Sequence, residues 1–598
     1  MATKIAVQLS RRKLMQASAA SLAGVKNGLA ASALLATKAG AQPASQSVAG
    51  YILARLAQHR VEKLFGIPGF TCKALFEAAA LPGSKVACVI TASDSEAGQA
   101  ADGYARVRGL GAVALTYGVG TLALAPVIAG AFAERSPVVV INGGPSDADL
   151  AAQAQDGLLY EHSSGRPQSD MTIFREITAF AGRASKAADV PRIVDAALSA
   201  ALLDQRPVYV EIAHDIWTAS LAAPGAPLRP VKPPAGGEDA LAAQILARLA
   251  GASKPVLLLG IEIARYDLGS QIDALVRKLG IPWATTLLAK SVLDESTPGF
   301  AGVYGGSNAV PALAQLVEQA DVILAIGCVF GVRFRRLVTG SRDRLVVVAN
   351  DKVRTGTATG KPANLATLAT ALASPAWTAR PEWIANANLP GLAYEQRRQS
   401  LPRRPASPAG TLSYDQVLGA VSQFLTNRHI VISDTSLSMY AAGDLKVAGA
   451  GSFVCNGVWQ SIGFSLGAAI GVALGQDRRP VVICGDGGFQ LNPQSLSTMV
   501  AMRVPVIVIV LDNGLYGIEQ FLVGGYYGIP SASPLPWLAL NRWDYEGLAK
   551  AMGFASTASA GSPAEFARAL ASAAAFAGPA LISVRIDPHS LPAGLPAT

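Results

Sequence analysis

Short, uninterrupted runs of Val, Ile, Leu and Ala recur along the chain and alternate with longer segments whose apolar residues have a helical spacing. These runs lie at 111–118, 137–144, 207–214, 255–260, 321–327, 344–350, 429–435, 480–487 and 505–513. Continuous apolar strands that alternate with helices are typical of parallel sheets covered by helices on both faces. The sequence therefore predicts an α/β fold with mostly parallel sheets.

Two Pro-rich segments, 221–237 and 401–410, interrupt this alternation and have the composition of exposed linkers. A chain of 598 residues is also too long for one ordinary hydrophobic core. We therefore expect a leader followed by three doubly wound domains, and their predicted ranges are 1–45, 46–218, 238–375 and 411–588.

The composition excludes two classes of protein. No stretch offers the roughly 20 consecutive apolar residues that a membrane-spanning helix needs. The formal net charge of +9 suggests a nucleic-acid partner at first sight, but six basic residues lie before residue 45, where there is no acid. Without them the charge falls to about +3, which argues against a nucleic-acid-binding face. The six residues are Lys4, Arg11, Arg12, Lys13, Lys26 and Lys38.

The leader contains a candidate targeting signal. In "SRRKLMQASAASLAG" (10–24) two arginines precede a segment of small, weakly apolar residues, and "AGAQ" (39–42) offers a small-x-small cleavage site. This pattern resembles a twin-arginine export signal, which predicts a periplasmic protein that begins near Gln42. The alternative is a basic, disordered N-terminus on a cytoplasmic protein.

Polar residues follow two successive apolar runs of the third predicted domain. Asp486 ends the run in "VVICGDGGFQ" (481–490), and Asn513 ends the next, 27 positions later. A right-handed βαβ crossover places both strand ends at one edge of the sheet, where such folds bind ligands. A carboxylate and an amide oxygen suit Mg²⁺ or Ca²⁺, and Mg²⁺ commonly also binds substrate phosphates.

The glycines around Asp486 indicate what else this edge binds. Gly485, Gly487 and Gly488 allow backbone N–H groups to approach a phosphate closely at the start of the next helix. The predicted site therefore holds a metal ion together with a diphosphate.

At this point the sequence resembles the thiamin-diphosphate (ThDP) enzymes, whose signature opens with GDG and closes with NN. Here the second pair is "DN", with Asp512 in the first position. The resemblance implies that Mg²⁺ is held by Asp486, Asn513 and the backbone carbonyl of Leu515. Segments at 64–69, 100–109, 116–146, 290–306, 459–471 and 516–520 extend the likeness to the pyruvate and indolepyruvate decarboxylases.

The same resemblance implies roles for residues around the cofactor. Ile462 is expected to lie under the thiazolium ring, and the Gln460 carbonyl to accept from the aminopyrimidine. Ser436 and Ile518 are further expected cofactor contacts. The glutamate that contacts the pyrimidine in the family is replaced here by Asp94. Glu96 is a possible substitute, although we expect it to be an acid on the helix surface.

Two further positions depart from the decarboxylase pattern. Phe70 replaces an acid, and Glu161-His162 replaces a His-His pair. His162 is expected to act in catalysis, and Glu519, within "YGIEQ", is expected to supply a proton to the reacting carbon. Phe70 makes the expected pocket more apolar, which suggests a bulky or apolar substrate.

The resemblance implies non-oxidative decarboxylation of a 2-oxo acid to an aldehyde. Two alternatives remain open: a ThDP-dependent carboligase or carbon–carbon lyase, favoured by Phe70, and a catalytically silent binding protein, favoured by Asp94. It also implies a homodimer or homotetramer with its active sites at the subunit interface.

Overall fold

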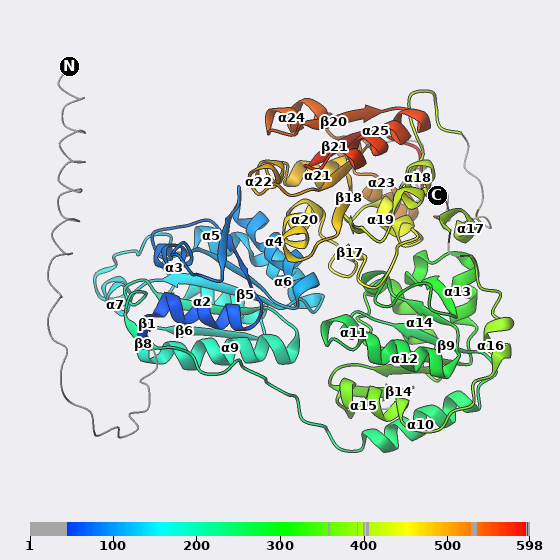
Figure 1. Ribbon diagram of the computed structural model, residues 1–598, viewed down its shortest axis with the longest axis horizontal. Coiled ribbons are helices and arrows are strands. Elements are labelled where there is room, and N and C mark those ends of the chain that lie inside the picture. The colour runs from blue at the N-terminus through cyan, green and yellow to red at the C-terminus, as the bar shows by residue number, and fades with distance from the viewer. Residues whose placement is uncertain are drawn as a thin grey trace, which may run out of the picture. The chain divides into compact units, whose positions relative to one another are not determined.

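The computed structural model describes residues 45–593 and 595, apart from 357–358, 392, 399–400, 402–405 and 528–534. The expected leader thus lies outside the described residues except for Ser45. Figure 1 shows the domains in chain order: N-terminal in blue to cyan, central in green, and C-terminal in yellow to red. None of the helices in these ranges is long and apolar enough to cross a membrane.

The N-terminal domain is built on a six-stranded sheet of order β3-β2-β4-β5-β7-β6, in which all neighbouring strands are parallel. Its strands are β2 (Lys63–Gly66), β3 (Ala87–Ile90), β4 (Gly111–Thr116), β5 (Val138–Gly144), β6 (Phe180–Ala184) and β7 (Val208–Ala213). Its helices are α2 (Val48–Gln58), α3 (Lys73–Ala79), α4 (Asp94–Arg108), α5 (Val119–Ala123), α6 (Ala125–Ala133), α7 (Asp147–Asp156), α8 (Ser169–Glu176) and α9 (Val190–Asp204). A two-stranded antiparallel pair, β1 (Ser45–Ser47) with β8 (Ser220–Ala222), joins the two ends of this region.

The central domain has a seven-stranded sheet of order β11-β10-β9-β12-β13-β14-β15. It is parallel as far as β13, and β14 and β15 are added antiparallel at one edge. The strands are β9 (Pro255–Leu259), β10 (Trp283–Thr285), β11 (Phe300–Val303), β12 (Val322–Ile326), β13 (Leu345–Val348), β14 (Lys352–Thr355) and β15 (Lys361–Pro362). The helices are α10 (Glu238–Ala250), α11 (Glu262–Arg265), α12 (Gly269–Leu279), α13 (Pro311–Glu318), α14 (Arg335–Gly340), α15 (Leu365–Ala373) and α16 (Pro381–Ala385), followed by α17 (Tyr394–Arg398).

The C-terminal domain again has six parallel strands, in the order β17-β16-β18-β19-β21-β20. They are β16 (His429–Ser433), β17 (Phe453–Cys455), β18 (Arg479–Gly485), β19 (Ile507–Asp512), β20 (Ser556–Ala560) and β21 (Ala580–Arg585). The helices are α18 (Tyr414–Phe424), α19 (Leu437–Ala442), α20 (Phe464–Gly475), α21 (Asp486–Leu491), α22 (Ser495–Ala501), α23 (Gly517–Tyr527), α24 (Tyr545–Ala551) and α25 (Pro563–Ala575). The expected fold class, three doubly wound α/β domains with mostly parallel sheets, is confirmed.

Alternate residues of the C-terminal strands belong to different hydrophobic cores. Val482 and Val508 pack in the core shared with α20 and the N-terminal domain, whereas Val481 and Ile507 pack in the core that contains α18 and α25. Successive side chains of a strand point to opposite faces of its sheet. Both faces of this sheet are therefore covered, which explains why its strands are apolar throughout.

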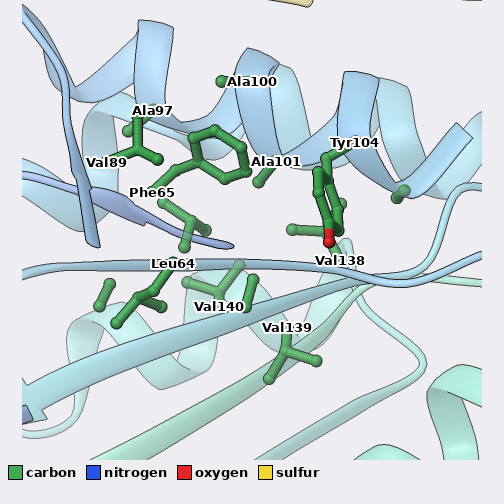
Figure 2. Close-up of a cluster of buried hydrophobic side chains, with 14 of the residues drawn as sticks. Leu64, Phe65, Val89, Ala97, Ala100, Ala101, Tyr104, Val138, Val139 and Val140 are labelled. Carbon is green, nitrogen blue, oxygen red and sulfur yellow. The ribbon is translucent and has the colours of Figure 1, made fainter. Parts of the chain in front are cut away.

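Helix α4 packs against both the N-terminal sheet and the C-terminal domain. Ser93 caps its N-terminus by accepting the N–H of Glu96, and Gly109 ends it with a φ of 89°. One face places Ala97, Ala101 and Tyr104 over the strand residues of the N-terminal sheet, as Figure 2 shows. The opposite face packs on α20, where an added Cβ at Gly103 would lie 2.2 Å from the carbonyl oxygen of Ala468. Only glycine permits so close a helix pair.

Candidate active site

The predicted metal-binding residues lie together at the carboxyl edge of the C-terminal sheet. Strands β18 and β19 are parallel neighbours with Gly485 opposite Leu511, so Asp486 and Asn513 follow adjacent strand ends. Asp486 Oδ2 accepts the N–H of Gly514 at 2.6 Å, and Oδ1 accepts the N–H of Gly487 at 2.9 Å. The two residues thus lie at the same edge of the sheet, as expected from a right-handed βαβ crossover.

Asp486 is 2% exposed. Its pKa is raised to about 7 in total: burial is the largest cause and the charge of Asp512 adds to it, while the hydrogen bonds from Gly514 and Gly487 act in the opposite direction. Asp512 itself pairs with Arg542 at 3.1 Å. Among the described residues, Asp486 forms no ion pair with a basic side chain, and a buried carboxylate of this kind is suited to bind a cation.

Asn513 is fixed by two hydrogen bonds. Its Nδ2 donates to the hydroxyl of Tyr414 at 3.1 Å, and its Oδ1 accepts the N–H of Leu515 at 3.0 Å. The Leu515 carbonyl accepts the N–H of Gly517. Within the described ranges, no three His, Cys, Asp or Glu side chains converge in a way that could hold a metal ion. A metal at Asp486 would therefore depend on amide and carbonyl oxygens as well.

Most of the residues predicted to bind cofactor or metal line a single pocket beside Asp486. From the prediction it contains Ser436, Ile462, Gly485, Asp486, Gly487, Gly488, Asn513, Leu515 and Ile518, and in addition Tyr414, Thr435, Leu437, Ser438, Leu511, Tyr516 and Gly517. Gln460 and the expected catalytic residues of the N-terminal domain are not among its lining residues.

Two glycines of this pocket cannot carry a larger side chain without a steric clash. A Cβ at Gly487 would lie 2.6 Å from the ring of Tyr516, and one at Gly488 would lie 2.9 Å from Asp434 Oδ1. The backbone at the first turn of α21 is therefore bare on the pocket side. This arrangement fits a diphosphate that approaches the main chain.

Asp434 is a structural part of the site that sequence reasoning missed. It is 1% exposed, and its two oxygens accept the N–H groups of Gly463 and Ser465, both at 2.9 Å. Burial raises its pKa, and those hydrogen bonds lower it. Its position immediately after the apolar run at 429–433 gave the same signal as Asp486. Tyr414 follows a linker and had no such signal.

Ile462 and Gln460 belong to a loop between β17 and α20. Ile462 is half-buried and faces the pocket. Gln460 has a φ of 60°, in the left-handed region that non-glycine residues rarely adopt, and its N–H donates to Asn456 Oδ1 at 2.9 Å. The conformation of this loop is thus held by its surroundings.

Asp94 and Glu96 lie in the first turn of α4, but their surroundings differ. Asp94 is half-buried with Oδ1 near Gly120, and burial raises its pKa. Glu96 is fully buried and accepts the N–H of Ala92 at 3.2 Å, so the expectation that it is a surface acid is wrong. The reason is that α4 packs on the C-terminal domain, where Ser495 and Thr498 face Glu96.

The side chains of His162 and Glu519, the other two expected catalytic residues, are exposed to solvent in the single chain. His162 has a φ of 63°, and its carbonyl lies against Gly118 at the end of β4. Glu519 lies in the first turn of α23, next to Ile518 of the pocket. Phe70 is 68% exposed and lies 6.1 Å, between ring centroids, from His214, which binds Asp149. Sequence reasoning did not identify His214.

All three domains match family models. Residues 46–164 match "Thiamine pyrophosphate enzyme, N-terminal TPP binding domain", 242–373 match the central domain of the same family, and 435–584 match its C-terminal TPP binding domain. Among curated proteins, the "Alpha-keto-acid decarboxylase" of Mycobacterium avium (strain 104) is 31% identical over 500 residues, which are 82% of this chain and 85% of the relative. The chain belongs to the thiamine pyrophosphate enzymes.

Two more curated relatives show a comparable identity. The "Alpha-keto-acid decarboxylase" of Mycobacterium ulcerans (strain Agy99) is 31% identical over 80% of this chain and 83% of the relative. That of Mycobacterium tuberculosis (strain CDC 1551 / Oshkosh) is 29% identical over 85% and 88%. All residues that line the pocket beside Asp486, except Tyr414, lie in the region that matches the C-terminal thiamine pyrophosphate binding domain, which identifies ThDP as the cofactor of this enzyme.

Proposed function

We propose that this enzyme decarboxylates a 2-oxo acid non-oxidatively and releases an aldehyde. The observation that carries the proposal is the set of Asp486, Asn513 and the bare glycine backbone in one pocket, with Glu519 one residue beyond its edge. Relatives of nearly the same length named alpha-keto-acid decarboxylase support the choice of reaction. When bound, ThDP supplies a carbon that can carry negative charge and receive the substrate carbonyl carbon.

Mg²⁺ fits the residues at this edge. Asp486 is a buried carboxylate, and Asn513 and Leu515 add neutral oxygens. This hard oxygen set is what Mg²⁺ prefers, and phosphate oxygens and water complete its coordination. Asp486, Asn513 and the Leu515 carbonyl would hold the metal, while Gly487 and Gly488 leave room for the diphosphate.

The remaining expected site residues orient the cofactor or transfer protons. Ile462 and Gln460 orient the cofactor, Asp94 binds its pyrimidine, and Glu519 and His162 exchange protons with the substrate carbon and its oxygen. Asp94 and His162 do not line the pocket of their own chain. We therefore infer that each active site combines the N-terminal domain of one subunit with the C-terminal domain of another, in a homodimer or homotetramer.

The substrate is proposed to be bulky or apolar. Phe70 stands exposed after β2 at the carboxyl edge of the N-terminal sheet, where the family has an acid. This change also favours the second candidate function, a carboligase or carbon–carbon lyase, because it removes a proton donor.

A direct experiment distinguishes these functions. Purified protein is incubated with ThDP, Mg²⁺ and a panel of aliphatic and aromatic 2-oxo acids, while CO₂ and carbonyl products are measured. Aldehyde release supports the decarboxylase, and acyloin as the main product supports the carboligase. Absence of both products across the panel would refute both and favour a silent binding protein.

Residues 1–44 lie outside the described residues, and export to the periplasm through the twin-arginine route is part of this proposal.

A further inference from the structure

The loop that carries Gln460 and Ile462 is held by a buried ion pair from the N-terminal domain. Glu134, which caps the C-terminus of α6, has no exposed surface. Its Oε1 accepts the N–H groups of Val458 and Trp459 at 2.7 and 2.9 Å. Its Oε2 accepts a hydrogen bond from Arg106 Nη2 at 2.8 Å. One carboxylate thus binds two successive residues that are more than 300 positions away in the sequence.

Arg106, near the end of α4, holds the two ends of the same loop. Its Nη1 donates to the carbonyl of Cys455 at 2.9 Å, and its guanidinium lies 4.9 Å from the ring centroid of Phe464. Asp102 binds it from the previous turn of α4. Burial opposes the charge of Arg106, but Asp102 and Glu134 together hold its pKa well above the ordinary value.

Packing from α6 adds a third restraint. Gly130 lies one turn before Glu134, and an added Cβ there would be 2.8 Å from Cδ1 of Trp459. The indole therefore lies directly against the helix backbone. Loop residues 455, 458, 459 and 464 are all restrained by the N-terminal domain of the same chain.

The residues between these restraints are the ones expected to touch the cofactor. Gln460 follows Trp459 directly and holds a φ of 60°, which a glutamine keeps only where neighbouring contacts impose it. Ile462 follows two residues later and lines the pocket. A small change in the path of the loop would displace both the Gln460 carbonyl and the Ile462 side chain.

We propose that Glu134 and Arg106 are positioning residues that fix the loop 455–464 and so place Gln460 and Ile462 against the cofactor. This inference rests on the proposed function for the roles of Gln460 and Ile462. The diphosphate end of the pocket is formed by other elements, β18 to α21 and β19 to α23. Loss of the ion pair should therefore impair activation of the cofactor much more than its binding.

The test compares Glu134→Gln with Glu262→Gln. Glu262 is a matched control because it is also buried, at 1% exposed, pairs with Arg135 of another domain at 3.1 Å, and accepts a backbone N–H, that of Asn350. It has no hydrogen bond with the loop 455–464. Both variants lose one buried negative charge at a domain boundary.

Three quantities are measured on the full chain. Amide hydrogen exchange of the peptide that covers 455–464 reports the loop in cofactor-free protein. Calorimetry gives the dissociation constant of ThDP with Mg²⁺, and NMR of quenched samples gives the exchange rate of the thiazolium C2 proton in the holoenzyme. None of these needs a substrate.

For Glu134→Gln we expect faster amide exchange at Val458 and Trp459 and slower C2 proton exchange by about 10–100-fold, because misplacement by about 1 Å can have that effect. The ThDP dissociation constant should change by less than about threefold, since the diphosphate contacts remain. Glu262→Gln should leave all three quantities near wild type. Should Glu134→Gln fail to fold, Arg106→Lys keeps the charge but removes the planar guanidinium, and it carries the same expectations.

Wild-type C2 exchange in both Glu134→Gln and Arg106→Lys would overturn the inference. An equal slowing in Glu262→Gln would also overturn it, because the effect would then be one of general stability. A wild-type protein that exchanges C2 but releases no aldehyde would refute the proposed function and leave this inference intact.

Discussion

Asp486 accepts the backbone N–H of Gly514 at 2.6 Å, although the two residues belong to different βα connections. This bond joins the end of β18 to the end of β19 and brings the GDG and DN segments of the signature together. It holds one carboxylate oxygen against the main chain beside the pocket. Asp486 is therefore both a structural link between two strand ends and the best candidate for a metal ligand.

We expect Asp486→Ala to abolish retention of ThDP, because the remaining Asn513 and Leu515 oxygens are too few to bind Mg²⁺ firmly. Cofactor content after gel filtration measures this. Asp512→Asn is the control: it changes the neighbouring carboxylate to the residue usual in the family and should retain the cofactor. Near wild-type cofactor content in Asp486→Ala would contradict the metal assignment.

The pH dependence of the metal-free protein should reveal the buried carboxyl. Burial raises the pKa of Asp486 to about 7, above its ordinary value, so the neutral form stabilises the fold. That contribution is full below the ordinary pKa of about 4 and is lost as the pH rises through about 7. The melting temperature of Asp486→Asn relative to wild type should therefore rise between about pH 4 and 7. Thermal melts without metal measure it, and a constant difference would contradict the prediction.

Two inactive variants should restore activity in mixed oligomers. Asp94 and Asp486 are proposed to serve one site from different subunits, so Asp94→Ala and Asp486→Ala each inactivate a homodimer. Subunits mixed at equal amounts after denaturation and refolding should regain about a quarter of wild-type activity, since half of the dimers are mixed and each has one intact site. Each variant refolded alone is the control. An active monomer in light scattering would refute the arrangement.

Asp94→Ala should slow exchange of the thiazolium C2 proton by about 10²–10⁴-fold, the usual contribution of a general acid or base. ThDP binding should change far less. Asp94→Glu restores the family side chain and should preserve or raise the rate.

Glu96→Gln is the matched control for Asp94→Ala, because Glu96 lies in the same helical turn but faces Ser495 and Thr498. It should leave C2 exchange nearly unchanged. If Glu96→Gln stops the exchange and Asp94→Ala does not, the two acids have the opposite roles.

The leader can be tested in a bacterial host. With Arg11 and Arg12 intact, the mature protein should begin near Gln42 and be found in the periplasm. Replacing both arginines by lysine should retain the protein in the cytoplasm, because the export machinery reads the arginine pair. Cell fractionation and N-terminal sequencing measure this, and equal distribution of the two versions would contradict export.

Local sequence patterns predicted the strands and the chemistry at their ends. The apolar runs at 480–487 and 505–513 predicted β18 and β19, because strands buried on both faces must be apolar throughout. The convergence of Asp486 and Asn513 followed from the handedness of a βαβ unit, which is a local rule. Family resemblance then added roles to residues that local rules do not reach.

Contacts between domains could not be predicted from local patterns and became visible in the folded protein. Glu96 has the sequence context of a surface acid, yet it is buried because α22 covers it. Glu134 follows an ordinary apolar helix, and nothing near it in the sequence indicates that it binds Val458 and Trp459. Hydrophobic periodicity reports which face of an element is buried, but not which distant element covers that face. The partner of a buried charge is therefore fixed by the packing of whole domains.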